Sequence, residues 1–148
     1  MPRGIGKLSS LEMLSMFVVD KNGSHDGADI CELRGLNNLR EELRIINLGF
    51  IKNAKEKFKA ANLKEKQHLR SLDLIWGGGN GDDEKSLEDL QPHSNLKELR
   101  IVEWRGDAKF PIWFSLLTNS SVLKYRVGII SNISRPFLNC VIFKMISP

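Results

Sequence analysis

One block of apolar residues recurs four times along this chain at a nearly constant spacing. The clearest copy is LRSLDL at 69–74, and LKELRI at 96–101 repeats it. Two further copies are LREELRI at 39–45, which has one extra residue, and LEMLSM at 11–16. The second leucine of these blocks falls at Leu14, Leu43, Leu72 and Leu99. Successive copies are therefore 29, 29 and 27 residues apart, and a period in this range predicts stacked copies of one structural unit.

The block matches the consensus of a leucine-rich repeat, in which each copy contributes one short strand. Alternate side chains of a strand point to one face, so Leu72 and Leu74 are expected to point inward and Asp73 outward. Leucine is common enough to form one such block by chance, but four copies in register argue against chance. The sequence therefore predicts an α/β fold, a leucine-rich-repeat solenoid. A short parallel β-sheet is expected on its concave face, with helices and irregular segments on its convex face.

The repeats predict one leucine-rich-repeat domain over residues 1–128, with about four to five repeats and an N-terminally truncated first copy. The residues expected to face its first core layer are Leu8, Leu11, Leu14 and Met16. A fifth repeat in strict register would bury Arg126 and Gly128, whereas a shift of one residue buries Val122, Tyr125 and Val127. No register can be followed through residues 129–148, which are expected to form a C-terminal tail.

The segment 51–66 has the clearest helical pattern. Its apolar positions, at spacings of three and four, are Ile51, Ala54, Phe58 and Ala61. Off that face lie Lys52, Lys55, Lys57, Lys59, Lys64 and Lys66. A basic patch for nucleic acid or acidic lipid is one interpretation, but no aromatic residues alternate with the lysines as a single-strand binder would need. The favoured interpretation is a solvated helix on the convex side.

No motif in the sequence nominates an enzyme, a cofactor site or a metal site. Gly4-Ile-Gly6-Lys7 superficially resembles a phosphate loop, but Leu8 stands where that motif requires serine or threonine. The histidines and the two cysteines are scattered without ligand spacing, and a net charge of +4 does not demand nucleic acid. No run approaches the ~18 apolar residues of a membrane span, and the N-terminus has no signal-peptide pattern. A cytoplasmic protein is expected.

Several longer blocks carry a family resemblance. They are GIGKLSSLEML at 4–14, FVVD at 17–20, GLNNLREELRIINL at 35–48, AANLKEKQHLRSLDLIW at 60–76, LEDLQPHSNLKELRI at 87–101 and FPIW at 110–113. Together they resemble the leucine-rich-repeat region of plant intracellular disease-resistance proteins of the coiled-coil, nucleotide-binding, leucine-rich-repeat class. The resemblance covers residues 1–114. Glu41 departs from it, because the family commonly has glycine in the corresponding LRGEL block, and this departure is expected to alter a bulge there.

The resemblance implies a non-catalytic protein-recognition module in plant defence. Such receptors sense pathogen effectors directly or through a guarded host protein, and they hold themselves inactive until then. The implied partners are an effector, a guarded host protein or the receptor's own nucleotide-binding domain, with no nucleic acid and no membrane span. ATP or ADP is expected only in that separate domain, because no phosphate loop is present here. The alternatives are a substrate-recognition adaptor of a ubiquitin ligase, an extracellular repeat receptor and a non-functional truncated receptor fragment.

The predicted register places the outward residues of successive strands in rows across the sheet, ~4.8 Å apart. One row is Ser15, Arg44, Asp73 and Arg100, and the next is Phe17, Ile46, Ile75 and Val102. The second row is apolar on a face that should be wet, which is typical of an interaction surface when charge borders it. Cover by a wider protein, or strand propensity alone, would also explain it. The predicted protein-binding residues are Arg44, Ile46, Asp73, Ile75, Arg100 and Val102.

Overall fold

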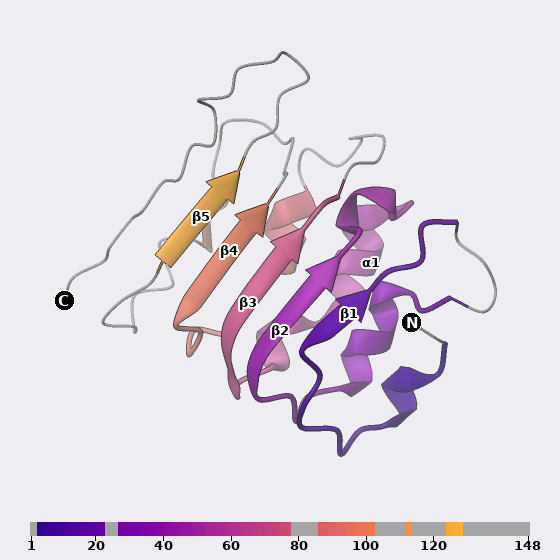
Figure 1. Ribbon diagram of the computed structural model, residues 1–148, viewed down its shortest axis with the longest axis horizontal. Coiled ribbons are helices and arrows are strands. Elements are labelled where there is room, and N and C mark those ends of the chain that lie inside the picture. Colours follow the sequence, from indigo (N-terminus) through magenta and orange to yellow (C-terminus); the bar gives the residue numbers. More distant parts are fainter. Residues whose placement is uncertain (1–2, 23–26, 78–85, 103–111, 114–123, 129–148) are drawn as a thin grey trace, which may run out of the picture.

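Among the described residues, five parallel strands form one sheet in the computed structural model (Figure 1). The structure describes residues 3–22, 27–77, 86–102, 112–113 and 124–128. The strands are β1 (Met16–Val18), β2 (Glu41–Ile46), β3 (Leu69–Ile75), β4 (Glu98–Val102) and β5 (Lys124–Gly128). Their order across the sheet is their order in the chain, and every neighbouring pair is parallel. Each repeat therefore adds one strand, which confirms the predicted α/β fold with a parallel sheet.

Helical segments connect the strands and pack against one face of the sheet. The longest is α1 (Ala54–Ala61), which lies behind the strands in Figure 1. The short 3-10 helices are η1 (Ile5–Lys7), η2 (Ile30–Gly35), η3 (Leu48–Phe50), η4 (Leu63–Glu65) and η5 (Ser86–Leu90). α1 packs between η2 and η5, so these segments form one layer. We call the sheet face beneath this layer the packed face, and the opposite face the open face.

The core lies between the packed face and the helical layer, and two ladders of side chains run through it. One ladder is Leu43, Leu72 and Leu99, all fully buried. The other is Phe17, Ile45, Leu74 and Ile101, all at most 1% exposed. Full burial of one such side chain contributes about 1.5–3 kcal/mol, so stacked repeats gain a core that one strand cannot supply. Alternation therefore placed the inward residues of β2, β3 and β4 correctly.

The first strand differs from its predicted register by one residue. Phe17 pairs with Ile45 and is fully buried, whereas Met16 pairs with Arg44 and is 40% exposed. The expectation that Leu8 and Met16 face the core is therefore wrong, and Leu8 is 55% exposed. Leu11 and Leu14 are partly buried against the core. The run Met16–Val19 has no polar residue to mark its outward side, so the volume of Phe17 decides which residues point inward.

The fifth strand follows the shifted register that the sequence allowed. Tyr125 pairs with Leu99 and Val127 pairs with Ile101 along β5. The proposed contribution of Val122 and the tail 129–148 both lie outside the described residues. The strand thus continues the repeat with one residue fewer than strict periodicity requires.

The helix of the second repeat is shorter than predicted. α1 spans Ala54–Ala61, and Asn53 and Asn62 flank it in the left-handed conformation with φ of 55° each. Asparagine tolerates that conformation better than most residues, so these two positions limit the helix. Phe58 is fully buried, as its spacing predicted, and its ring meets Trp76 edge to face at 6.4 Å.

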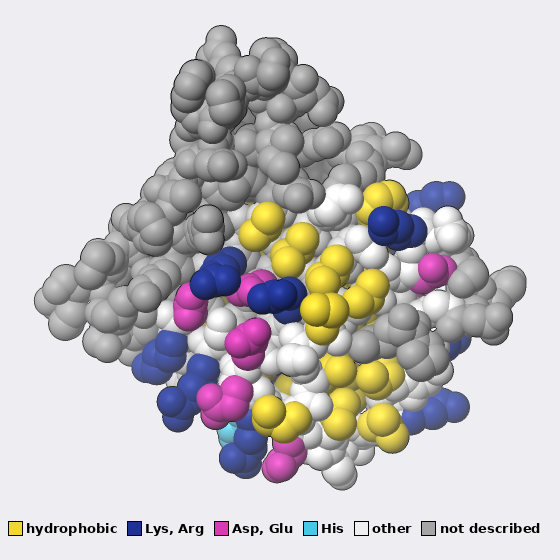
Figure 2. All heavy atoms as spheres, viewed as in Figure 1, with side chains coloured by type: hydrophobic (Ala, Val, Ile, Leu, Met, Phe, Trp, Pro, Cys, Tyr) yellow, Lys and Arg dark blue, Asp and Glu magenta, His cyan; other side chains and the backbone are white. Residues whose placement is uncertain are grey.

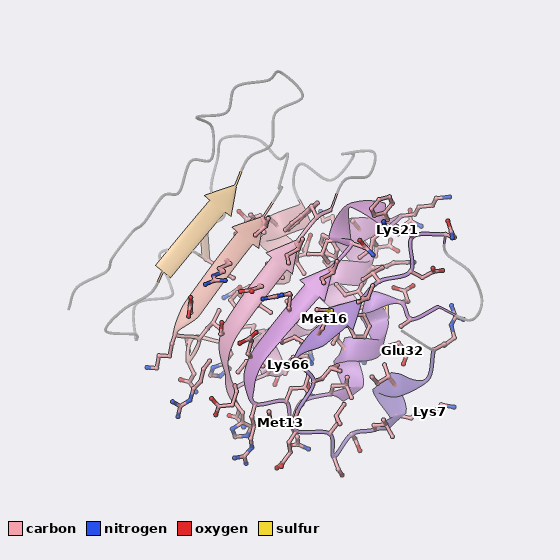
Figure 3. The ribbon with its side chains drawn as sticks, viewed as in Figure 1. Lys7, Met13, Met16, Lys21, Glu32 and Lys66 are labelled. Carbon is pink, nitrogen blue, oxygen red and sulfur yellow. The ribbon has the colours of Figure 1, made fainter. Side chains whose placement is uncertain are left out.

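Lys66 corrects the expectation that all six lysines of this segment are solvated. Lys66 is only 1% exposed (Figure 3). Its Nζ donates hydrogen bonds to Leu33 O and to Asn37 Oδ1, the latter at 3.0 Å. Burial lowers the pKa of its ammonium to about 8, against a small opposing effect of Glu65. Lys66 therefore acts as a polar tie from η4 across the core to the preceding repeat.

Asn47 forms the turn that follows β2. It adopts a left-handed conformation with φ of 70°, is 8% exposed and begins η3. Its Nδ2 donates a hydrogen bond of 3.1 Å to Val19 O in the preceding repeat. This bond satisfies a buried carbonyl at the end of β1, so the side chain joins two repeats.

Trp113 packs against η5. Trp113 is 2% exposed, and its Nε1 donates a hydrogen bond of 3.0 Å to Leu87 O. Leu87 and Leu90 of η5, which is a 3-10 helix, are also buried.

Candidate functional site

The open face carries two rows of side chains that the strand register brings together. The apolar strip consists of Val18, Ile46, Ile75 and Val102, one residue from each of β1 to β4. The arginine row beside it consists of Met16, Arg44, Asp73 and Arg100. Figure 2 shows a line of hydrophobic side chains across this face with basic and acidic groups next to it. The six residues predicted to bind protein therefore lie together on one surface.

The register of β1 changes the first member of each row. Met16 and Val18 occupy the places expected for Ser15 and Phe17. Phe17 faces the core, so the sequence interpretation missed Val18 as a member of the apolar strip. Met16 and Val18 are two residues apart, as residues on one face of a strand must be, and the large aromatic side chain of Phe17 between them was the sequence signal for the observed register.

The members of the apolar strip are half-buried by their neighbours on the sheet. Val18, Ile46, Ile75 and Val102 all have intermediate exposure. Their alternation with the fully buried ladders leaves one side of each residue open to solvent. Four aliphatic side chains in adjacent strands form a contiguous patch, which differs from the single exposed apolar residues common on protein surfaces.

Asp73 lies under the arginines and is almost inaccessible, at 5% exposure. Its Oδ2 accepts a hydrogen bond of 3.3 Å from Arg44 Nε and lies 3.9 Å from Arg100 Nη1. The expectation of an exposed outward residue is therefore wrong, although Asp73 does point to the open face. Burial raises the pKa of its carboxyl, and the two guanidinium groups lower it less than burial raises it. The two arginines thus offset only part of the cost of burying the ionised Asp73 carboxylate.

A third row of side chains, which includes two glutamates, lies farther from the apolar strip. Glu42, Ser71 and Glu98 are register neighbours on β2, β3 and β4. The Glu98 carboxylate lies 3.6 Å from Arg100 Nη2. Across the open face the order is therefore an acidic row, then the arginine row, then the apolar strip. On the side of the arginine row, the described residues that put accessible charge next to the strip are Arg44 and Arg100, whose side chains are 37% and 43% exposed.

A hollow lies away from the sheet face, beside the loop that follows β1. Its volume is about 410 Å³, and its lining includes Arg3, Lys21, Asp29, Phe50 and Lys57. Lys57 Nζ lies 2.7 Å from Asp29 Oδ2, and Lys21 Nζ lies 5.2 Å from the centre of the Phe50 ring. These charges already have partners within the protein. Each pair links residues of two successive repeats, so the hollow lies at the contact between repeats.

In the part of the chain that the structure describes, no three His, Cys, Asp or Glu side chains cluster in a way that could hold a metal ion. Within the same residues, no helix has the length and apolar character needed to cross a bilayer.

Parallel strands at a leucine-rich period, joined by short helical turns, define a leucine-rich-repeat protein. Residues 30–129 match the family described as R13L1/DRL21 LRRs, and the chain belongs to this family. This match extends through β2 to β5 and includes all six residues predicted to bind protein, which lie between positions 44 and 102.

Relatives with known names are plant disease-resistance proteins. The chain is 40% identical over 141 residues to the disease resistance protein RGA2 of Solanum bulbocastanum, which covers 91% of this chain and 13% of that protein. It is 34% identical over 102 residues to the putative disease resistance RPP13-like protein 1 of Arabidopsis thaliana, which covers 61% of this chain and 10% of that protein. These similarities confirm the resemblance drawn from the sequence blocks. The chain spans only about an eighth of RGA2.

Proposed function

We propose that this chain is a protein-recognition module in plant defence, part of an intracellular immune receptor, and that its open face binds the partner. The observation that carries the proposal is the apolar strip, left open to solvent on a sheet whose arginines border it. The relatives are named for disease resistance, which supports the defence role. The partner is a pathogen effector, a guarded host protein or the receptor's own nucleotide-binding domain in the resting state.

The proposal includes a solenoid whose open face is concave. A curved stack of repeats presents adjacent strands as one continuous surface, which is how solenoids bind large partners. Aliphatic side chains beside exposed arginines have the composition of interface hot spots, where a few anchors contribute most of the affinity. We place the recognition domain at residues 1–128 and the protein in the cytoplasm, and we assign it no catalytic role.

The test places this segment in a full-length receptor and substitutes Ile75→Glu and Arg100→Glu in separate variants. Ile75→Glu puts a charge in the middle of the apolar strip, and Arg100→Glu reverses an accessible charge beside it. We expect each to weaken partner binding at least about ten-fold, or to activate the receptor without a pathogen if the resting contact is the one lost.

Lys55→Glu provides the matched control, because Lys55 is an exposed residue of α1 on the other side of the sheet. It should leave binding and the resting state unchanged. If both open-face variants keep normal partner binding and normal autoinhibition, with native circular dichroism, the open face is not the recognition surface.

A further inference from the structure

The hollow beside the loop after β1 lies beyond the carboxyl ends of two neighbouring strands. Residues 19–22, which follow β1, form one wall, and residues 50–53, which follow β2 through η3, form another. Lys21 lies at this end of the sheet in Figure 3. The rest of the described lining is Arg3, residues 27–29 and Lys57. With a volume of about 410 Å³, the hollow has the size of a site for a small molecule.

Part of the lining of the hollow is apolar. Val19, Ala28 and Ile51 line it and are buried. Phe50 lines it as well and is half-buried, so its ring keeps some accessible surface. A small molecule in the hollow therefore meets aliphatic and aromatic surface, which favours a ligand with an apolar or aromatic body.

Cations outnumber carboxylates in the described lining. The four cationic and two acidic side chains are Arg3, Lys21, Lys52, Lys57, Asp20 and Asp29. Lys57 pairs with Asp29 at 2.7 Å, whereas the Phe50 ring near Lys21 leaves the charge of that ammonium in place. Lys52 forms no ion pair with any described residue. The excess of two positive charges attracts an anion to the hollow.

Three of these cations have donors left for that anion. Arg3 donates from Nε to Gly27 O at 3.4 Å, and a guanidinium has further N–H groups on its two other nitrogens. Lys21 and Lys52 are both exposed, so their ammonium groups can turn toward a ligand. Charge-assisted hydrogen bonds from such groups to anionic oxygens are stronger than neutral ones.

A phosphate monoester fits this arrangement better than a carboxylate does. It carries about −1.5 to −2 charge at pH 7 and three strong acceptor oxygens, which matches the excess charge and the three cations. A carboxylate brings one charge and two oxygens, and it leaves part of the excess without a partner.

We propose that this hollow binds a small phosphate monoester with an aromatic body. The phosphate lies among Arg3, Lys21 and Lys52, and the body lies against Phe50 and Ile51. This inference goes beyond the proposed function, because the hollow is separate from the open face. Since its walls belong to the first and second repeats, a bound ligand also stabilises the contact between them.

Equilibrium dialysis with adenosine monophosphate as the probe tests the proposal. This method counts bound ligand per chain whatever the state of association of the chain. Adenosine lacks the phosphate, and inorganic phosphate lacks the aromatic body. We expect adenosine monophosphate to bind with a Kd of about 1 mM or lower, and each of the other two at least about ten-fold more weakly.

Two variants assign the binding to the hollow. Lys52→Glu should weaken binding of adenosine monophosphate at least about ten-fold. Lys64→Glu is its matched control, because Lys64 is an exposed lysine of η4 outside the lining and gives the same change in charge, so binding should be unchanged. Phe50→Leu should weaken binding of adenosine monophosphate and leave that of inorganic phosphate unchanged. Circular dichroism checks that each variant keeps the native fold.

Each contrary result removes a stated part of the proposal. Inorganic phosphate bound as tightly as adenosine monophosphate would overturn the aromatic body, and adenosine bound as tightly would overturn the phosphate. Absence of binding at about 1 mM, or an equal loss in Lys52→Glu and Lys64→Glu, would overturn the site itself. None of these results bears on the open face, which Ile75→Glu and Arg100→Glu test separately.

Discussion

Asp73 sits between two guanidinium groups, but its burial outweighs their attraction. The raised pKa of its carboxyl means that ionisation costs more in the folded chain than in the unfolded one. Stability from this group is therefore greatest below the unfolded pKa of 3.8 and falls as the pH rises through the higher folded value. The pair of ion contacts to Asp73 is consequently weak support for the fold at neutral pH.

The first prediction compares Asp73 with its neighbour in β3. Asp73→Asn keeps the size of the side chain and removes the charge, and the arginines stay partly solvated, so we expect a change below about 1 kcal/mol at pH 7. Leu72→Ala removes a fully buried side chain and should cost about 2–5 kcal/mol. Urea titration measures both. A loss above about 2 kcal/mol for Asp73→Asn would show that its ion pairs stabilise the sheet.

The second prediction concerns Lys66, whose contribution to stability should rise with pH, whereas that of Asp73 falls. Its ammonium has a pKa of about 8 in the fold and 10.5 when solvated, so the unfolded chain holds the extra proton between those values. The free energy of unfolding should therefore rise between pH 8 and 10.5, by up to about 3 kcal/mol at ~1.4 kcal/mol per unit.

Lys66→Met isolates this contribution, because methionine is long and apolar and does not titrate. The difference in stability between the native chain and Lys66→Met should change across that pH range, while the variant itself lacks the rise. Parallel stability curves for the two proteins would show that folding does not lower the pKa of Lys66.

At the scale of the element, the start of β2 holds the one strained backbone position in a described strand. Glu41 has φ of 64°, and the pairing of β2 with β3 shifts register between Glu41 and Glu42. The bulge expected from the sequence is therefore present, with glutamate where the resemblance predicts glycine. Its carboxylate lies 3.9 Å from Arg70 Nε with both side chains largely exposed, so this contact adds little.

The third prediction follows from that strain. The left-handed conformation costs a residue with a Cβ about 1–2 kcal/mol, and glycine recovers part of this against its greater freedom when unfolded. Glu41→Gly should therefore stabilise the chain by about 0.5–1 kcal/mol in thermal or urea melts. Glu42→Gly, one residue on in ordinary strand conformation, should destabilise it by about the same amount. The same sign for both changes would contradict this account of the bulge.

At the scale of the whole molecule, the repeat period predicted the parallel sheet and its central ladders, because Leu72 and Leu74 alternate with polar or exposed neighbours. The same period placed Arg44, Asp73 and Arg100 in one row. It could not place β1, where Met16, Phe17 and Val18 are all apolar and alternation gives no direction.

Burial of polar groups was the other gap in the prediction. Lys66 looks like one more lysine of a basic segment, and its role depends on Leu33 O and Asn37 Oδ1, which lie 33 and 29 residues earlier, in the preceding repeat. Asp73 was assigned to the correct face, but its low exposure arises from two arginine side chains that only the register brings over it. Such contacts depend on how three repeats stack, which the spacing of leucines does not specify.

The last prediction concerns the end of the sheet at β1. Among the described strands β1 has a neighbour on one side only, and three apolar residues in or before it, Leu8, Met13 and Met16, are 55%, 68% and 40% exposed. Figure 3 labels Met13 and Met16. An unpaired edge next to exposed apolar side chains favours association with another chain. We expect the isolated chain to self-associate at micromolar concentration in light scattering, and Leu8→Lys with Met13→Lys to shift it toward monomer.

Ile112→Lys alters an exposed apolar residue elsewhere, at 78% exposure, and should leave association unchanged. A monodisperse monomer for the native chain, or an equal effect of Ile112→Lys, would show that this end of the sheet does not drive association.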